Sequence, residues 1–244
     1  MAFVMPSFCF GNNVVNALFE QGNAWYTKAR YKEAMTAYQQ IIDKGYQSAA
    51  VYFNMGNVSY KNGDIPAALL YYEKAHRLSP GDDDINFNIR FANLRTTDKV
   101  DEIPEFFLTR WWRAFMLSFS IGTLSAMSIV FMLLASAALI LYFFANSVTL
   151  KKASFYASLL LLVFFFLTFF IANRQTVYFT GHRQAIVFTS SVSVKNGPVD
   201  QSNTLFVIHD GTKVNILERS NGWMKISLPN GNEGWMKASD AKEI

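Results

Sequence analysis

The sequence has 244 residues, of which 51% are hydrophobic and 16% are charged, and its formal net charge is +4. An average soluble domain carries roughly 25% charged residues, so the apolar excess between Phe106 and Ile171 argues for membrane segments rather than a large soluble core. The positive charge is scattered without a lysine or arginine run, which excludes a nucleic-acid partner. The single cysteine, Cys9, excludes a disulfide framework and a cysteine-based zinc site within one chain.

The chain begins with an apolar stretch from Ala2 to Phe10 that is followed by Gly11. This stretch is typical of the end of a signal-peptide core, although it is short and has no positively charged start. We therefore predict that residues 1–11 are the remnant of a signal peptide, with a frayed apolar tail as the alternative. A lipoprotein role for Cys9 is disfavoured, because Phe8 stands where a small residue is needed.

Two copies of one pattern follow, 34 residues apart. Small residues recur at Gly22 and Gly56, large aromatic residues recur at Tyr38 and Tyr72, and the second copy ends at Pro80. The period and the residue types resemble the tetratricopeptide repeat, a unit of two helices that stacks on its neighbours. In such a unit the small residues let the paired helices approach closely and the aromatic residues fill the space between units.

A further helix is predicted after the second copy. Three aspartates at residues 82–84 supply an N-cap and an acidic first turn, and the helix runs on to about Leu94. Arg90 stands where the repeat has its glycine, so we expect a capping helix rather than a third repeat. Residues 12–95 are thus predicted to be two tetratricopeptide repeats plus a capping helix.

Residues 96–121 are predicted to be a linker and an interfacial segment. Tryptophan and arginine side chains both settle at the boundary between lipid and water. We therefore assign to the membrane interface the cluster Arg110, Trp111, Trp112 and Arg113.

The next stretch carries two predicted transmembrane helices. No charged residue occurs from Ala114 to Leu150, which exceeds the roughly 20 residues that one span needs. We predict, in order, a helix at 122–145, a turn at 146–152, a helix at 153–172 and a linker at 173–184. So short a turn makes a hairpin, which places both flanking domains on the same side of the membrane.

The orientation of this hairpin rests on opposing signals. Lys151 and Lys152 favour a cytoplasmic turn, whereas four arginines near the far ends of the two spans favour the reverse. With the signal-peptide remnant taken into account, we expect a cytoplasmic turn and two exported domains.

From residue 185 the hydrophobic period changes to that of short strands. Alternating runs are separated by turn signals such as Asn221-Gly222 and Pro229-Asn230-Gly231. We predict about five strands in residues 185–244, closed into a small barrel. The segments 211–214, 222–226 and 234–236 resemble the bacterial SH3-like domain. The predicted fold class is therefore a multidomain membrane protein with all-α repeats, a two-helix transmembrane hairpin and a small all-β SH3-like barrel.

No residue pattern supports catalysis or cofactor binding. The cysteine lies in residues 1–11, and His209, next to Asp210, is expected to be an ordinary exposed histidine rather than a base beside a nucleophile. Neither glycine-rich phosphate-binding motif occurs. His76, His182 and His209 fall in different segments, so no metal site is expected. We predict a protein that is not an enzyme and needs no cofactor.

Binding surfaces are predicted instead on both soluble domains. In tetratricopeptide proteins the first helix of each repeat lines a peptide groove, and the matching residues here are Phe19, Asn23, Tyr26, Phe53, Asn57 and Tyr60. The resemblance implies that the two asparagines bond to the backbone of an extended ligand, or else that they only follow the repeat consensus. Phenylalanines replace the lysines of a carboxylate clamp, which favours an apolar ligand or a protein surface. On the barrel, Trp223 and Trp235 are either binding aromatics or half-buried core residues.

The order of these parts resembles the BatE family of the Bacteroides aerotolerance operon. The resemblance spans nearly the whole chain and is carried by residues 56–80, 98–99, 110–113, 206–213 and 222–226. It implies an inner-membrane protein with two periplasmic domains, working beside von Willebrand-type and MoxR-type ATPase partners in aerotolerance or oxidative stress of the envelope. The leading hypothesis is a protein-binding scaffold. Its rival is a cell-wall sensor whose SH3-like domain recognises peptidoglycan, and a hydrolase would require an unrecognised catalytic role, for instance at His209.

Overall fold

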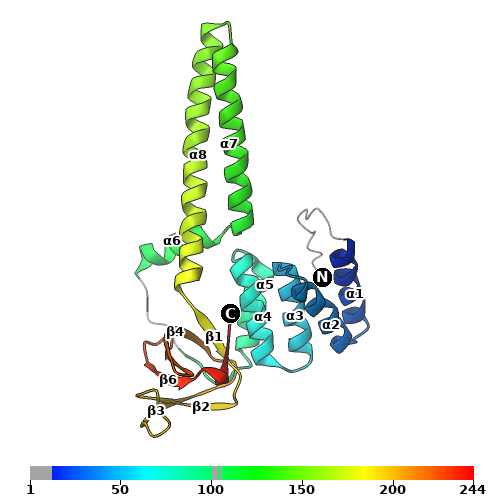
Figure 1. Ribbon diagram of the computed structural model, residues 1–244, viewed down its shortest axis with the longest axis vertical. Helices are drawn as coiled ribbons and strands as arrows, with labels where there is room; N and C mark the ends of the chain where they lie inside the picture. The colour runs from blue at the N-terminus through cyan, green and yellow to red at the C-terminus, as the bar shows by residue number, and fades with distance from the viewer. Residues whose placement is uncertain (1–12, 101–103, 105) are drawn as a thin grey trace. The chain divides into compact units, whose positions relative to one another are not determined.

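A computed structural model describes residues 13–100, residue 104 and residues 106–244 (Figure 1). The chain divides into two compact units, one made of Met1–Pro104 with His182–Ile244 and the other of Glu105–Gly181. The predicted signal-peptide remnant at residues 1–11 lies outside the described residues. The predicted fold class is confirmed, because helical repeats, two long apolar helices and an antiparallel β-domain follow one another along the chain.

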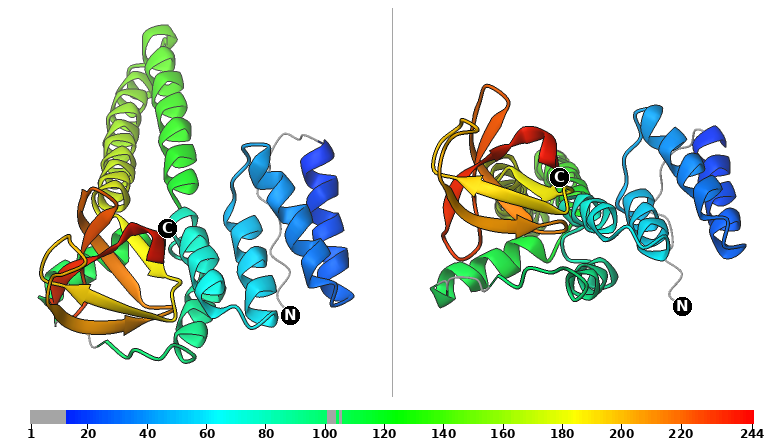
Figure 2. Two further views of the ribbon diagram at one scale, coloured as in Figure 1. Left: turned by 60° about the horizontal axis from the view of Figure 1, so that its bottom comes forward. Right: turned by 90° about the horizontal axis from the view of Figure 1, so that it is seen from below.

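Residues 13–100 hold five helices that follow one another as an array (Figures 1 and 2). They are α1 (Asn13–Thr27), α2 (Tyr31–Asp43), α3 (Ala49–Lys61), α4 (Ile65–Leu78) and α5 (Asp83–Asn93). Ser48, Asp64 and Asp82 cap the starts of α3, α4 and α5 by accepting hydrogen bonds from first-turn N–H groups. The turn inside each repeat has a residue with positive φ, Ala29 at 55° and Gly63 at 79°, so the alanine adopts the backbone that glycine favours.

Close contact between paired helices depends on the two repeat glycines. A Cβ atom on Gly22 would lie 2.4 Å from Cε1 of Tyr38, and one on Gly56 would lie 2.5 Å from Cδ1 of Tyr72. Both distances are far below van der Waals contact, so each tyrosine ring covers a position where only a hydrogen atom fits. The predicted close approach of the paired helices is thus visible. The aromatic rings, which were expected to fill the space between units, make this contact inside their own unit.

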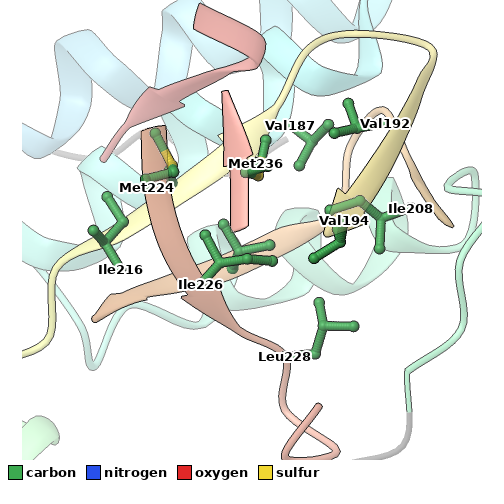
Figure 3. Close-up of a cluster of buried hydrophobic side chains, with 11 residues drawn as sticks. Val187, Val192, Val194, Ile208, Ile216, Met224, Ile226, Leu228 and Met236 are labelled. Atoms are coloured by element: carbon green, nitrogen blue, oxygen red, sulfur yellow. The ribbon is translucent and has the colours of Figure 1, made fainter. Parts of the chain in front are cut away.

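Residues 184–243 form one antiparallel sheet of seven strands, where about five were predicted. The strands are β1 (Gln184–Val187), β2 (Ser191–Lys195), β3 (Thr204–His209), β4 (Lys213–Ser220), β5 (Trp223–Ser227), β6 (Glu233–Lys237) and β7 (Ala241–Glu243), with a 3-10 turn at Ala238–Asp240. Their order across the sheet is β3-β2-β6-β5-β4-β1-β7. Inward-facing residues such as Val194, Met224, Ile226 and Met236 form the core (Figure 3). The unpredicted β1 and β7 have four and three residues, too few to show an alternating pattern.

The β-domain shares a core with the repeats inside the first unit. Ile186 of β1 is fully buried in a cluster with Leu69, Leu70 and Tyr72 of α4. An ion pair lies beside this cluster, with 2.7 Å between Lys213 Nζ and Glu73 Oε2, and the side chains are 35% and 6% exposed respectively. Arg77 of α4 donates a hydrogen bond to the carbonyl oxygen of Ile244. The two predicted domains are therefore packed together rather than held only by their linkers.

The second unit holds α6 (Phe107–Leu117), α7 (Ile121–Phe144) and α8 (Val148–Gly181). α7 and α8 are long and apolar enough to cross a membrane. α7 lies within one residue of the predicted 122–145, whereas α8 starts inside the predicted turn and runs through most of the predicted linker at 173–184. No proline or glycine occurs in α8 before Gly181, so no residue there interrupts the helix.

Hydroxyl side chains join α7 to α8. Ser128 Oγ lies 2.9 Å from Thr168 Oγ1, and Ser158 donates a 3.0 Å hydrogen bond to the carbonyl oxygen of Ala135. Small residues and interhelical hydrogen bonds are the means by which helices associate in lipid, where apolar burial gives no driving force. The hairpin thus has the type of contact that a membrane-embedded pair requires.

Candidate functional site

The predicted groove residues occupy equivalent positions on the first helix of each repeat. They are Phe19, Asn23 and Tyr26 on α1 and Phe53, Asn57 and Tyr60 on α3, and all six are half-buried. α1 and α3 therefore each present a phenylalanine, an asparagine and a tyrosine in the same order along the helix. We call the surface that these residues form the groove face.

Each groove asparagine is fixed by two hydrogen bonds to its amide oxygen. The Tyr38 hydroxyl donates to Asn23 Oδ1 at 2.8 Å, and the Asn54 amide donates to the same oxygen at 3.0 Å. One repeat later, Asn57 receives the equivalent two bonds at the same distances. Burial raises the pKa of both tyrosines, Tyr38 and Tyr72, so they remain protonated donors. Within the described chain the two asparagine Nδ2 groups make no hydrogen bond, so a structural role and a ligand-binding role are compatible.

Three apolar residues on α5 and at its C-cap, which were not recognised as groove residues in the sequence, continue the groove face. Phe87, Phe91 and Leu94 stand one repeat after the groove residues of α3, and they are 56%, 46% and 73% exposed. The Phe91 ring lies 5.5 Å from the Tyr60 ring, and the Arg95 guanidinium lies 5.7 Å from the same ring. The 34-residue period was the signal that could have found them. The groove face thus ends on α5 as an apolar surface with a cation at its edge.

Trp223 of β5 and Trp235 of β6 lie on the outer face of the sheet, where they alternate with buried methionines. The Lys237 ammonium lies 5.7 Å from the Trp223 ring centroid. Lys225 and Lys195 are the cross-strand neighbours of Trp235. Lys225 and Lys237 also pair with carboxylates at 2.8 Å. This half-buried aromatic and cationic surface can stack on flat groups and bind anionic ones.

His209 was expected to be an ordinary exposed histidine, but Asp98 in the segment after α5 holds it in place. The Asp98 carboxylate accepts hydrogen bonds from the His209 N–H at 2.7 Å, from the His209 ring Nδ1 at 2.8 Å and from the Thr212 hydroxyl at 2.7 Å. Burial by itself would raise the pKa of Asp98, but the hydrogen bonds from Thr212 and His209 outweigh it and lower that pKa. This arrangement fixes the linker to the β-domain.

Replacing Asp98 with asparagine should destabilise the first unit in a pH-dependent way. Because the folded-state pKa is lowered, the carboxylate stabilises the wild type above the ordinary aspartate value of 3.8 and ceases to do so as the pH falls through the lowered pKa. We expect Asp98→Asn to cost roughly 1.5 to 3 kcal/mol at pH 7. Thermal unfolding from pH 3 to 7 should show this difference shrinking below about pH 4, and a difference that stays constant over the whole range would contradict the assignment.

The predicted interfacial residues lie together on α6. They are Arg110, Trp111, Trp112 and Arg113, and the two tryptophans are 65% and 38% exposed. Met116 on the same helix is buried against residues of α7 and α8. One face of α6 therefore packs on the hairpin while the indoles face outward, as in an interfacial helix.

Two segments of the chain match known domain families. Residues 49–82 match the tetratricopeptide repeat, and residues 190–242 match the bacterial SH3 domain. No curated protein matches the chain. Among solved structures, an NlpC/P60 family protein from Bacillus cereus shares 18% identity over 27% of this chain and 21% of that chain, with a TM-score of 0.22. A likeness at that level carries no functional conclusion.

Proposed function

We propose that this chain is a non-catalytic, membrane-anchored scaffold that holds partner proteins on its groove face. One observation carries the proposal. Phe87, Phe91 and Leu94 remain 56%, 46% and 73% exposed in line with the repeat groove, although Phe91 packs beside the Tyr60 ring. Contiguous exposed apolar residues mark interaction sites. The match to the tetratricopeptide repeat supports a protein partner.

The ligand that best fits the groove face is an extended segment with apolar side chains. The Nδ2 groups of Asn23 and Asn57 can donate to backbone carbonyls of such a segment. Its side chains would pack on Phe53, Phe87 and Phe91, and an acidic group near one end would meet Arg95.

The proposal places α7 and α8 across a bacterial inner membrane, with the repeats and the β-domain on the periplasmic side. Residues on both sides of the hairpin pack together in the first unit, through Asp98 with His209 and Glu73 with Lys213. The chain must therefore return to the side from which it entered, as two spans allow.

An alkaline phosphatase fused after Ile244 should be active in cells, and an inactive but stable fusion would reverse the orientation.

The module order resembles the BatE family, and on that resemblance we propose partners of the von Willebrand and MoxR-type ATPase classes. The role would be aerotolerance, in a complex that responds to oxidative stress of the envelope. The support is the resemblance together with the two domain matches.

A charge in the apolar end of the groove should abolish partner binding. We expect Phe91→Asp to reduce the amount of partner recovered with the full-length protein from native membranes at least tenfold, since an aromatic anchor of an interface contributes about 2 kcal/mol or more. Quantitative mass spectrometry of the purified complex measures this. Gln40→Asp, which adds the same charge on an exposed position of α2, is the control and should leave recovery unchanged. Equal recovery from both variants would rule out the groove face.

A cell-wall sensor is the second candidate, favoured by the tryptophans and lysines on the outer face of β2, β5 and β6. Trp223 and Trp235 can stack on sugar rings, and their lysine neighbours can bind carboxylates of the peptide stems. Full-length protein in detergent should then sediment with purified peptidoglycan, and Trp235→Ala should release it. Failure of the wild type to sediment would eliminate this candidate and leave the scaffold proposal intact.

A further inference from the structure

One of the positions at which the two repeats differ holds a large aromatic side chain in the first repeat and a small one in the second. Trp25 stands three residues after Gly22, and its ring is covered by two cations, with Lys28 Nζ 5.4 Å and Arg30 Cζ 4.1 Å from the centroid. In the second repeat the residue three positions after Gly56 is Ser59. The indole of the first repeat thus has no counterpart in the second.

A cavity of about 260 Å³ lies at the place where the second indole would be. Ser59, Asn62 and Asp64 line it, and they are the repeat equivalents of Trp25 and of the two cations that cover it. Ser59 is only 3% exposed, and its side chain is one of those that line the cavity. An apolar wall comes from Met35, Leu70 and Phe188.

The β-domain forms one wall of the cavity and supplies a cation there. Lys242 and Phe188 both line it, with the Lys242 ammonium 4.2 Å from the Phe188 ring centroid. Ser59 lies two residues from the groove residue Asn57, hence about 200° around α3, so the cavity opens away from the groove face. The site exists only because the repeats and the β-domain pack together.

We propose that this cavity is a second binding site, which takes the side chain of a tryptophan presented by a partner polypeptide. The indole would fill the place that Trp25 fills one repeat earlier, with Phe188 as an apolar wall and the Lys242 ammonium within reach of the ring. Ser59 Oγ and the Asp64 carboxylate are acceptors for the indole N–H. The proposal goes beyond the groove and does not depend on it.

Saturation-transfer NMR on the full-length protein in nanodiscs tests the site, with N-acetyl-tryptophanamide as the probe and N-acetyl-leucinamide as the matched control. The wild type should give a saturable signal for the tryptophan probe above that of the leucine probe. Ser59→Trp fills the cavity from within, so it should abolish this excess while leaving the thermal midpoint unchanged or higher. Lys242→Gln, an exposed change at the rim, should weaken binding about twofold to fivefold.

A wild-type signal that does not exceed the leucine control, or one that persists in folded Ser59→Trp, would overturn the proposal. Should Ser59→Trp fail to fold, Ala67→Phe fills the same cavity from α4 and is judged by the same criterion. Signal common to every variant measures partition of the probe into the bilayer and is subtracted.

Discussion

Lys213→Ala should destabilise the first unit more than Glu73→Gln, although both remove the same ion pair. Loss of Lys213 strands a carboxylate that is 6% exposed, whereas loss of the Glu73 charge leaves an ammonium that is 35% exposed and can reach water. Removing one partner of a fully buried pair costs about 3 to 5 kcal/mol. Because Lys213 is partly exposed, we expect about 2 to 3 kcal/mol for Lys213→Ala and about 1 kcal/mol for Glu73→Gln.

Thermal unfolding of the full-length protein, followed by tryptophan fluorescence, measures this asymmetry. The double variant Glu73→Leu/Lys213→Met provides the control, since well-packed apolar residues in place of a buried pair are often neutral or stabilising. It should recover most of the stability lost in Lys213→Ala. Equal losses in the two single variants would show that the pair is solvated and does not fasten the β-domain to α4.

Gly56→Ala should destabilise the repeats by about 2 kcal/mol, against the normal preference of helices for alanine. In a helix interior, alanine is favoured over glycine by about 1 kcal/mol. Here the new Cβ would lie 2.5 Å from the Tyr72 ring, and overpacking of this kind costs about 1 to 3 kcal/mol. Tyr72 cannot swing away without breaking its 2.8 Å hydrogen bond to Asn57, which adds about 1 kcal/mol.

The sign of this effect should reverse when the ring is absent. In a Tyr72→Ala background the clash is gone, so Gly56→Ala should become neutral or stabilising, and the double-mutant cycle isolates the contact. Gly22→Ala with Tyr38→Ala repeats the experiment one unit earlier. A loss that persists without the ring would place the cause in the backbone of α3 instead.

The sequence predicted those features that a period or a composition encodes. The 34-residue spacing of Gly22 and Gly56 gave the repeats, and the uncharged stretch from Ala114 to Leu150 gave the hairpin. The segments 211–214, 222–226 and 234–236, which resemble the bacterial SH3-like domain, overlap β4, β5 and β6. Each of these signals lies within one segment of the chain, so it can be recognised without knowing how the segments pack.

Contacts between distant segments could not be predicted in this way. The hydrogen bonds of Asp98 reach His209 across 111 residues, and the Glu73–Lys213 pair spans 140. No sequence period relates these positions. A histidine at the end of a strand gives no sign in the sequence of the carboxylate that binds it in the fold. Phe87 and Phe91, in contrast, could have been predicted as groove residues, because they stand 34 residues after Phe53 and Asn57. They were missed because Arg90 at the glycine position marked the helix as a cap.

The groove face, extended onto α5, is proposed to bind a partner protein outside the lipid. Photo-crosslinking in native membranes tests this binding most directly, with the photoreactive residue at Phe91 in one sample and at the exposed Gln40 of α2 in another. We expect one or a few discrete adducts from position 91, absent from position 40 and suppressed when Phe87→Asp is added. Adducts of equal yield at both positions, or none at position 91, would contradict the scaffold proposal.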